Sequence, residues 1–449
     1  MSSRPVAIDL FAGAGGLSLG FEQAGFDVVA AVEVDPIHAA IHQYNFPNCV
    51  VLPTSIAGLS AQTIRRQAGM GAREVDIVIG GPPCQGFSLM GQRVLDDPRN
   101  RLVREFVRLV DELSPRFFLL ENVKGLTVGE HRQVLDELVE AFQARGYGVR
   151  TPWQMLNAYN YGVPQNRQRL FLLGARQGET LPDYPMPITA LPQTSSQVQL
   201  AVTTPLGAPP TCQAALGDLP DAELFAELLD DDAVYTEGWG QPSAYAAELR
   251  CLSDRAWHLG YRRQWEPNLL TASARTRHTA LSRQRFAATQ PGAREPVSRF
   301  LKLVPDGVSN TLRAGTDSAR GSFTSPRPIH YALPRCITVR EMARLHGFPD
   351  WFRLHKTKWH GARQVGNAVP PPLARAIATE FVKVLGVNIP NPPAVLPLGD
   401  LAWLAMTMTE AAHYWRVEVP IAQRDRKTDP KKTSQGTSPL QPTQILNHS

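Results

Sequence analysis

Cys84 stands in a loop whose composition restricts the backbone around it. The run Asp76–Ile79 predicts a strand, and it is followed by Gly80-Gly81-Pro82-Pro83-Cys84-Gln85-Gly86-Phe87-Ser88. A lone cysteine is usually a small buried hydrophobic residue. This one follows the carboxyl end of a strand, where open α/β sheets place their active sites, and two prolines hold the chain before it. The pattern favours a nucleophile, whose thiolate would be stabilised by nearby amides and cations.

A carboxylate and two arginines occupy similar positions. Glu121 follows the predicted strand Phe117–Leu120, beside apolar residues that could raise its pKa and keep a proton available. Arg167 and Arg169 precede the predicted strand Leu170–Leu173 and, in strand geometry, face the same side. Both could then reach one anionic or carbonyl-bearing substrate. The alternative for this pair is an ion-pair cluster on the surface.

A glycine-rich turn follows the first predicted strand, Val6–Leu10. Phe11-Ala12-Gly13-Ala14-Gly15-Gly16 leads into a helical stretch from Leu17, so a ligand could approach backbone amides at a helix start. Glu33, at the end of the predicted strand Val28–Val34, is placed to accept hydrogen bonds from ribose hydroxyls. The glycine spacing is not GxGxxG, which counts against NAD or FAD. Taken alone, such a turn is as often structural as ligand-binding.

The elements that must position these groups alternate between short apolar runs and amphipathic stretches. We therefore expect an α/β domain with a mostly parallel sheet. The clearest helices are His131–Arg145, which Gly146 follows, and an apolar-faced stretch from Leu373 to Leu385, which Gly386 follows. The length of 449 residues allows two or three domains.

Composition indicates the compartment. The 5 cysteines are scattered and form no CxxC pair, so we expect no disulfide framework, no zinc knuckle and a reducing environment. Met1–Phe11 is interrupted by charged residues too early for a secretory signal. The apolar run Leu396–Met408 is shorter than the roughly 20 residues that a membrane span needs. These features predict a soluble cytoplasmic protein.

Charge is segregated in the second half of the chain, after a proline-rich stretch that begins near Pro182. Residues 218–248 hold nine acidic and no basic residues, whereas residues 250–350 hold 17 Lys or Arg against 7 Asp or Glu. Such a charge run is usually an ordinary solvated surface. However, sixteen of these seventeen are arginine, the planar donor suited to phosphates and base edges. Residues beyond about 424 are polar and predict a disordered tail.

Together these motifs resemble the C5-cytosine DNA methyltransferase family. Seven blocks match in family order: DLFAGAGGLSLGF (9–21), VEVD (32–35), GGPPCQGFS (80–88), ENV (121–123), QNRQRLF (165–171), TVREMARLHGFPD (338–350) and QVGNAVPPPLARAI (364–377). The resemblance implies a Rossmann-like S-adenosylmethionine-dependent methyltransferase fold with helices on both faces of the sheet. It also implies a catalytic domain of residues 1–184 and 331–390, a target-recognition domain of residues 185–330, and a C-terminal extension of residues 391–449.

The resemblance also implies residue roles. Cys84 adds to C6 of a flipped-out cytosine, Glu121 acts at N3, and Arg167 and Arg169 hold the base. The remaining implied sites form three sets. The methyl donor, S-adenosyl-L-methionine, contacts Phe11, Gly13, Gly15, Gly16, Leu17, Glu33, Pro82, Leu102 and Asn367; the base contacts Pro83, Gln85 and Ser88; candidates for DNA contacts are Arg275, Arg277, Arg283, Arg285 and Arg313. No metal is required.

One position departs from the family pattern, and alternatives stay open. The family usually has an aspartate near the adenine amino group, where this chain reads Thr54-Ser55-Ile56, and a serine hydroxyl accepts that hydrogen bond less strongly. We expect a monomer that acts on double-stranded DNA without a membrane, in a prokaryotic restriction-modification setting with a separate cognate endonuclease. The rivals are a transfer-RNA cytosine-C5 methyltransferase, a silent DNA-binding protein of the same fold and a nicotinamide-dependent oxidoreductase.

Overall fold

A computed structural model describes residues 4–83, 100–123, 131–191, 206–315 and 327–419. Within these residues an eight-stranded sheet has the order β3-β2-β1-β4-β5-β8-β6, and β7 also pairs with β8. The strands are β1 (Val6–Leu10), β2 (Asp27–Val32), β3 (Val50–Leu52), β4 (Ile77–Gly80), β5 (Phe117–Val123), β6 (Tyr147–Val149), β7 (Gln154–Asn157) and β8 (Gln168–Arg176). β1 to β5 pair in parallel, whereas β8 runs antiparallel to β5, β6 and β7.

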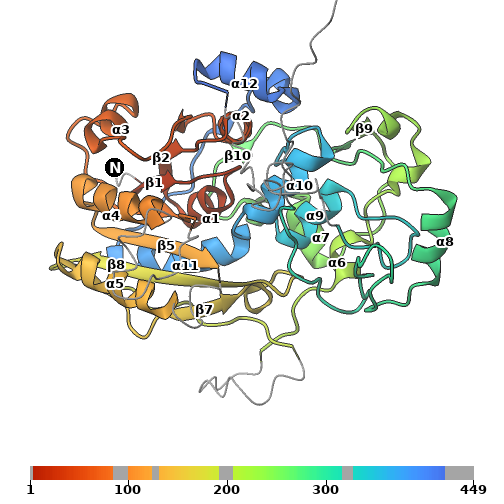
Figure 1. Cartoon of the computed structure of the whole chain (residues 1–449), viewed down its shortest axis with the longest axis horizontal. Helices are drawn as coiled ribbons and strands as arrows, with labels where there is room; N and C mark the ends of the chain where they lie inside the picture. The colour runs from red at the N-terminus through yellow and green to blue at the C-terminus, as the bar shows by residue number, and fades with distance from the viewer. Residues whose placement is uncertain (1–3, 84–99, 124–130, 192–205, 316–326, 420–449) are drawn as a thin grey trace, which may run out of the picture.

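Helices cover both faces of this sheet, because its central strands are apolar on both sides. On one face, Ala7, Ile77 and Phe117 pack with helices α1 (Gly16–Ala24), α9 (Val339–His346) and α11 (Pro371–Leu385). On the other, Ile8 and Val78 pack with helices α3 (Ala61–Gln67), α4 (Arg101–Leu113) and α5 (His131–Gln143). The predicted α/β class with a mostly parallel sheet is confirmed (Figure 1).

Two element boundaries differ from the predicted ones in a way that matters for the site. β5 continues through Val123, so Glu121 lies inside the strand and not after it. Pairing explains the extension, because β8 bonds to β5 as far as Val123, opposite Arg169. β2 ends at Val32, one residue before Glu33.

A second body follows in the chain and is drawn in green to cyan in Figure 1. Its short elements are α6 (Cys212–Leu216), β9 (Val234–Tyr235), α7 (Ala244–Leu249), β10 (Arg262–Arg263), β11 (Leu269–Leu270) and α8 (Ala280–Ala288), with 3₁₀ turns at Ala222–Leu224, Glu227–Leu229 and Asp254–Trp257. Residues of α6 join the main apolar core through Cys212, Ala215 and Leu216, and two small apolar clusters lie farther out, one around Leu228 and Leu270 and one around Phe286 and Ile329. Ion pairs also join these elements, because acidic residues of the stretch 218–248 pair with basic residues later in the chain. The pairs are Arg344–Asp218, Arg335–Asp221, Arg283–Glu223, Arg277–Asp230 and Lys356–Asp231.

The chain then returns to the sheet. α10 (Lys358–Asn367) packs with α9, and α11 lies along α1. The residues after α11 form β12 (Val395–Leu396), a 3₁₀ turn η9 (Leu401–Ala405) and α12 (Met408–Trp415), which lie on α2 (Pro36–Asn45). No helix in the described part of the chain is long and apolar enough to cross a membrane.

Candidate active site

The carboxyl ends of three neighbouring strands bring the predicted catalytic segments together. Leu10 of β1 pairs with Gly80 of β4, and Gly80 pairs with Leu120 of β5. The residues that follow these three therefore emerge at one edge of the sheet. Cys84, Gln85 and Ser88 lie outside the described residues, whereas Pro83, immediately before Cys84, is exposed at this edge.

The start of the Cys84 loop is fixed directly beside Glu121. Asn122 Nδ2 donates a hydrogen bond of 3.0 Å to the carbonyl of buried Pro82. A Cβ atom at Gly81 would lie 2.7 Å from Glu121 Oε2, so any other residue there requires the carboxylate to shift. Sequence reasoning did not assign a role to Asn122, although it is the middle residue of the ENV motif. Gly81 and Pro82, which lead to Cys84, are thus held against Glu121 and Asn122.

Glu121 has the environment predicted for a carboxyl that keeps a proton. Its side chain is 13% exposed, and Oε1 lies 3.0 Å from Arg169 Nε. Burial raises the pKa of Glu121, and the positive charges of Arg169 and Arg167 oppose that rise. The raised pKa expected from the apolar surroundings is confirmed in direction. Burial thus favours the protonated carboxyl of Glu121, whereas the contact with Arg169 favours the ionised form.

The two arginines divide their tasks. Arg167 is fully buried, and its guanidinium donates to the carbonyls of Leu312, Gly366 and Ala368 at 2.8–3.0 Å. It thereby joins the segments at 312 and 366–368 to the start of β8. Arg169 keeps its side chain beside Glu121 and lines the adjoining cleft. Both arginines were expected to reach one substrate. Only Arg169 is placed to do so, because the terminal nitrogens of Arg167 bond to backbone carbonyls.

The glycine loop is tied to Glu33 by backbone hydrogen bonds. Glu33 Oε2 accepts from Gly13 N and Oε1 accepts from Asp35 N, both at 2.8 Å. Each oxygen keeps a second lone pair, so the carboxylate can still accept from ligand hydroxyls. Gly13 has φ +55° with open space where a Cβ would be, whereas a Cβ at Gly15 would lie 2.3 Å from the Phe46 ring. The loop is thus packed on one side and open on the other.

Further residues lie around this open side. Phe11 follows β1 directly, and Leu102 lies in the first turn of α4; both are half-buried and pack against the apolar cluster on one face of the sheet. Val34, directly after Glu33, is 57% exposed, which offers an apolar surface beside the carboxylate. Sequence reasoning did not single out Val34, for which the only signal was an apolar residue next to an acidic one. A ribose diol against Glu33 and an apolar ring against Val34 and Phe11 fit this arrangement, so the residues present suit a nucleoside-containing methyl donor.

The C-terminal segment reaches the loop as the resemblance implied. A Cβ at Gly16 would lie 2.5 Å from the carbonyl of Val369, which shows how closely α1 meets the chain after Asn367. The Asn367 side chain is exposed at the end of α10. Leu17 differs from the expectation for a cofactor contact: its side chain is 7% exposed and belongs to the main apolar core, because it starts the buried face of α1. Ser55 Oγ accepts a hydrogen bond from Ala57 N.

A cleft of about 830 Å³ adjoins Glu121 and Arg169. Five arginines line it, namely Arg169, Arg294, Arg299, Arg313 and Arg327, and no acidic residue is among its described lining residues. Arg327 is buried and donates to the Ile337 carbonyl and to Thr276 Oγ1. Arg299 and Arg313 are exposed, and neither forms an ion pair with a described residue. This cleft is a positively charged surface that leads to the catalytic edge.

Most arginines singled out from the sequence as DNA contacts lie elsewhere. Arg283 forms a bidentate ion pair with Glu223, Arg277 pairs with Asp230, and Arg285 lies 3.2 Å from Glu295. Arg275 donates to the Phe225 carbonyl. Of the five, only Arg313 lines the cleft. Many arginines of the basic stretch pair with acidic residues of the protein, so the sequence overestimated its free charge. Arg294 and Arg299, which the sequence did not single out, also line the cleft.

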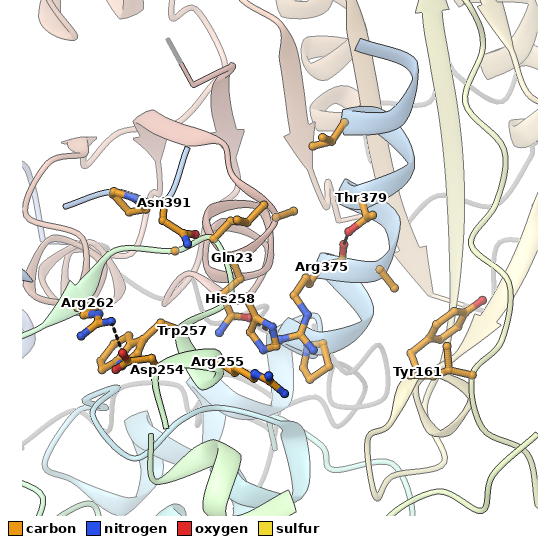
Figure 2. Close-up of a pocket in the computed structure, with 18 residues that line it drawn as sticks. Gln23, Tyr161, Asp254, Arg255, Trp257, His258, Arg262, Arg375, Thr379 and Asn391 are labelled. Carbon is orange, nitrogen blue, oxygen red and sulfur yellow. Dashed lines mark hydrogen bonds and ion pairs between the residues drawn. The ribbon is translucent and has the colours of Figure 1, made fainter. Parts of the chain in front are cut away.

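A second cavity, of about 750 Å³, lies at the carboxyl end of α1 and beside the outer face of α11 (Figure 2). Its charged groups largely bond to one another or to nearby residues: Arg262 to Asp254 at 3.0 Å, and Arg375 and His258 to Glu248. It lacks Glu121, Arg169 and the glycine loop, so it is separate from the catalytic edge. No group of three His, Cys, Asp or Glu among the described residues is arranged to hold a metal ion.

Comparisons with known proteins agree with this geometry. The profile of the family described as C-5 cytosine-specific DNA methylase matches residues 6–383. The type II methyltransferase M.XorII of Xanthomonas oryzae pv. oryzae is 55% identical over 428 residues, which cover 95% of this chain and 96% of the relative. M.AgeI of Thalassovita gelatinovora is 32% identical, over 84% of this chain and 99% of its own.

Solved structures show the same fold. An E. coli prophage-encoded protein described as a DNA modification methyltransferase superposes with a TM-score of 0.66 at 31% identity, over 85% of this chain and all of its own. The S. pombe Dnmt2 methyltransferase shares the fold at a TM-score of 0.50 and 15% identity. Together with the Glu121–Arg169 pair at the carboxyl edge of the sheet, these matches show that the chain belongs to the C-5 cytosine-specific DNA methylase family and is a DNA (cytosine-5-)-methyltransferase.

Proposed function

We propose that the protein transfers a methyl group from S-adenosyl-L-methionine to C5 of a flipped-out cytosine within a specific sequence of duplex DNA. The observation that carries this proposal is the placement of Glu121, paired with Arg169, against Gly81 and Pro82 at the start of the Cys84 loop. The same placement explains why a nucleophile and a proton-holding carboxyl act on one ring.

The chemistry follows from the weak nucleophilicity of cytosine C5. The Cys84 thiolate adds to C6, and Glu121 donates a hydrogen bond or its proton to N3, so the ring electrons become available at C5. Bound S-adenosyl-L-methionine supplies an electrophilic methyl group on a sulfonium. C5 would take this methyl group as the donor leaves as the neutral thioether. Loss of the C5 proton to solvent would then expel the Cys84 thiolate, and return of the N3 proton to Glu121 would restore the aromatic ring. Arg169, which lines the cleft, is placed to hold the base beside Glu121.

The methyl donor is assigned to the open side of the glycine loop. Glu33 would accept from the ribose hydroxyls, Phe11 and Val34 would contact the adenine ring, and Gly13 leaves room for the approach. Leu102, Pro82 and Asn367 remain proposed contacts. Gly15 and Gly16 contribute by close packing against Phe46 and Val369, which holds the loop in shape.

Duplex DNA is assigned to the arginine-lined cleft. A base that reacts at C5 must leave the stack, at a cost of a few kcal/mol that DNA contacts must offset. Arg299 and Arg313, which form no ion pair with a residue that the structure describes, supply guanidinium groups for those contacts, and Arg294 supports the backbone of Arg299 through a hydrogen bond of 3.0 Å. We assign residues 185–330 as the target-recognition domain, within a monomer.

The type II names of its relatives support a place in restriction-modification, with a separate endonuclease that cuts the unmethylated sequence. Bisulfite sequencing of DNA from cells that express the protein would give the target sequence and the modified base. A duplex with 5-fluorocytosine at that position should then trap the protein covalently when the methyl donor is present. Cys84→Ser should abolish trapping, whereas Cys251→Ser, at a half-buried cysteine of the second body, should preserve it. Normal methylation by Cys84→Ser, or methylation of transfer RNA and not of DNA, would refute the proposal.

A further inference from the structure

The family profile ends at residue 383, but the described chain continues as an ordered segment, which we call the C-terminal strap (residues 395–415). It lies across α2, as Figure 1 shows for α12. Two hydrogen bonds join it to α2: Gly399 N donates to the Tyr44 carbonyl at 2.9 Å, and Trp415 Nε1 donates to the Pro36 carbonyl at 3.1 Å. A third bond, from Lys356 N to the Leu404 carbonyl at 2.8 Å, joins it to the segment before α10. The strap is therefore docked along the whole length of α2.

The strap also reaches the glycine loop. Leu404 is 4% exposed and forms an apolar cluster with Ala14, Ile41 and Tyr44. Ala14 stands between Gly13 and Gly15, so this cluster joins Leu404 to the loop that we assign to the methyl donor. The first residue of α2, Pro36, comes directly after Asp35, whose backbone N–H binds Glu33. One element thus lies behind both groups that we assign to the donor.

The other end of the strap is joined to the second body. β12 pairs in parallel with β10, and Gln264 N donates to the Leu396 carbonyl at 2.8 Å. Arg263 of β10 is buried, with its guanidinium 2.8 Å from Glu22 and 3.0 Å from the Asn45 carbonyl. The strap begins on the second body and ends on the helix that follows the donor carboxylate.

We propose that the C-terminal strap is a positioning element for methyl-donor binding: it holds Ala14 and α2 so that the glycine loop and Glu33 keep their binding geometry. This inference depends on the donor site proposed above. A loop with positive φ at Gly13 and Gly15 has few contacts of its own on the open side, so its shape depends on what packs behind it. Because linkage is reciprocal, donor binding must also stabilise the docking of the strap.

The test compares three variants within one short turn. Leu404→Ala removes the contact with Ala14, Leu404→Met keeps its volume, and Leu401→Ala changes a side chain that is 65% exposed. Calorimetry with S-adenosyl-L-methionine alone should show affinity reduced at least about fivefold in Leu404→Ala. Leu404→Met and Leu401→Ala should bind like the wild type. The rate at saturating donor and DNA should be unchanged in all three.

Amide hydrogen exchange separates this role from a purely structural one, because a strap with only a structural role would show no change in exchange when the donor binds. The donor should slow amide exchange in α12 of the wild type and do so less in Leu404→Ala. Trp415→Phe, which removes the bond to Pro36 and part of the ring packing but keeps an aromatic side chain, should weaken donor binding in the same direction if Leu404→Ala is too unstable to study. Equal donor affinities of the wild type and these variants would overturn the role of the strap alone. A wild type that binds no donor would overturn the proposed function and this role with it.

Discussion

The arginine-lined cleft predicts a defined change in the salt dependence of DNA binding. Arg299 and Arg313 are exposed in the cleft and lack ion pairs with described residues, so each can neutralise one phosphate. Each neutralised phosphate contributes about −0.9 to the slope of log Kobs against log salt. Replacing both by glutamine should therefore reduce the magnitude of the slope by about 1.8. Affinity at low salt should fall for all sequences, with little change in the preferred one.

The assay is fluorescence anisotropy of a labelled target duplex over a series of salt concentrations. The matched control is Arg277→Gln with Arg283→Gln, two arginines of the same basic stretch that pair with Asp230 and Glu223. This control should leave the slope unchanged, because those charges are already compensated. A slope reduced by the control and not by the cleft pair would show that DNA lies on the other surface. A lost sequence preference with an unchanged slope would mean that the cleft arginines contact bases.

Three further predictions concern the catalytic edge. Burial raises the pKa of Asp9 to about 7 from 3.8, so the native protein binds a proton that the unfolded chain has released, and the contribution of Asp9 to stability should fall by up to about 4 kcal/mol as the pH rises from about 4 to about 7. Buried His42, whose pKa is lowered to about 3, changes stability in the opposite direction over part of this range, so a comparison with Asp9→Asn isolates the contribution of Asp9. Asp9→Asn should flatten that loss in thermal unfolding at pH 5 and pH 8, and an unchanged profile would contradict it. Gly81→Ala should displace Glu121 and lower kcat by on the order of 100-fold without changing donor affinity; a normal kcat would show that the carboxylate tolerates the shift. Ser55→Asp should tighten donor binding about fivefold in calorimetry, since a carboxylate accepts a stronger hydrogen bond than a hydroxyl, and weaker binding would place the adenine elsewhere.

The sheet and its catalytic edge were predictable because local rules determine them. Buried parallel strands have continuous apolar runs, so Val6–Leu10 was read from the sequence with the observed bounds and Ile77–Gly80 to within one residue. The glycine loop and Glu121 follow such runs directly. The error at Glu121, placed after the strand and found within it, arose from β8. Pairing with an antiparallel neighbour extends β5 through polar residues that no apolar pattern includes.

The arginines were harder to place because their partners are distant in the sequence. Arg344 lies 126 residues from Asp218, yet its guanidinium lies 2.9 Å from that carboxylate and 2.6 Å from Asp350. Arg167 reaches carbonyls up to 201 residues away. A sequence shows the type of each side chain, but not which oxygen it will meet. The same planar donor geometry that suits arginine to phosphate also suits it to buried carboxylates and carbonyls, so the residue type alone does not separate the two uses.

Charge segregation itself has a structural reason in this chain. When acidic residues fill one segment and basic residues another, pairing between the segments docks them, and the pairs between residues 218–248 and residues 277–356 do so here. Buried pairs add little net stability but are costly to break, so they fix which surfaces meet. The arginines left over are those with no acidic counterpart, and in the described chain Arg299 and Arg313 are two of these, both in the cleft beside Glu121. We therefore infer the surface for DNA from the arginines that lack described acidic partners, and not from the total count of arginine.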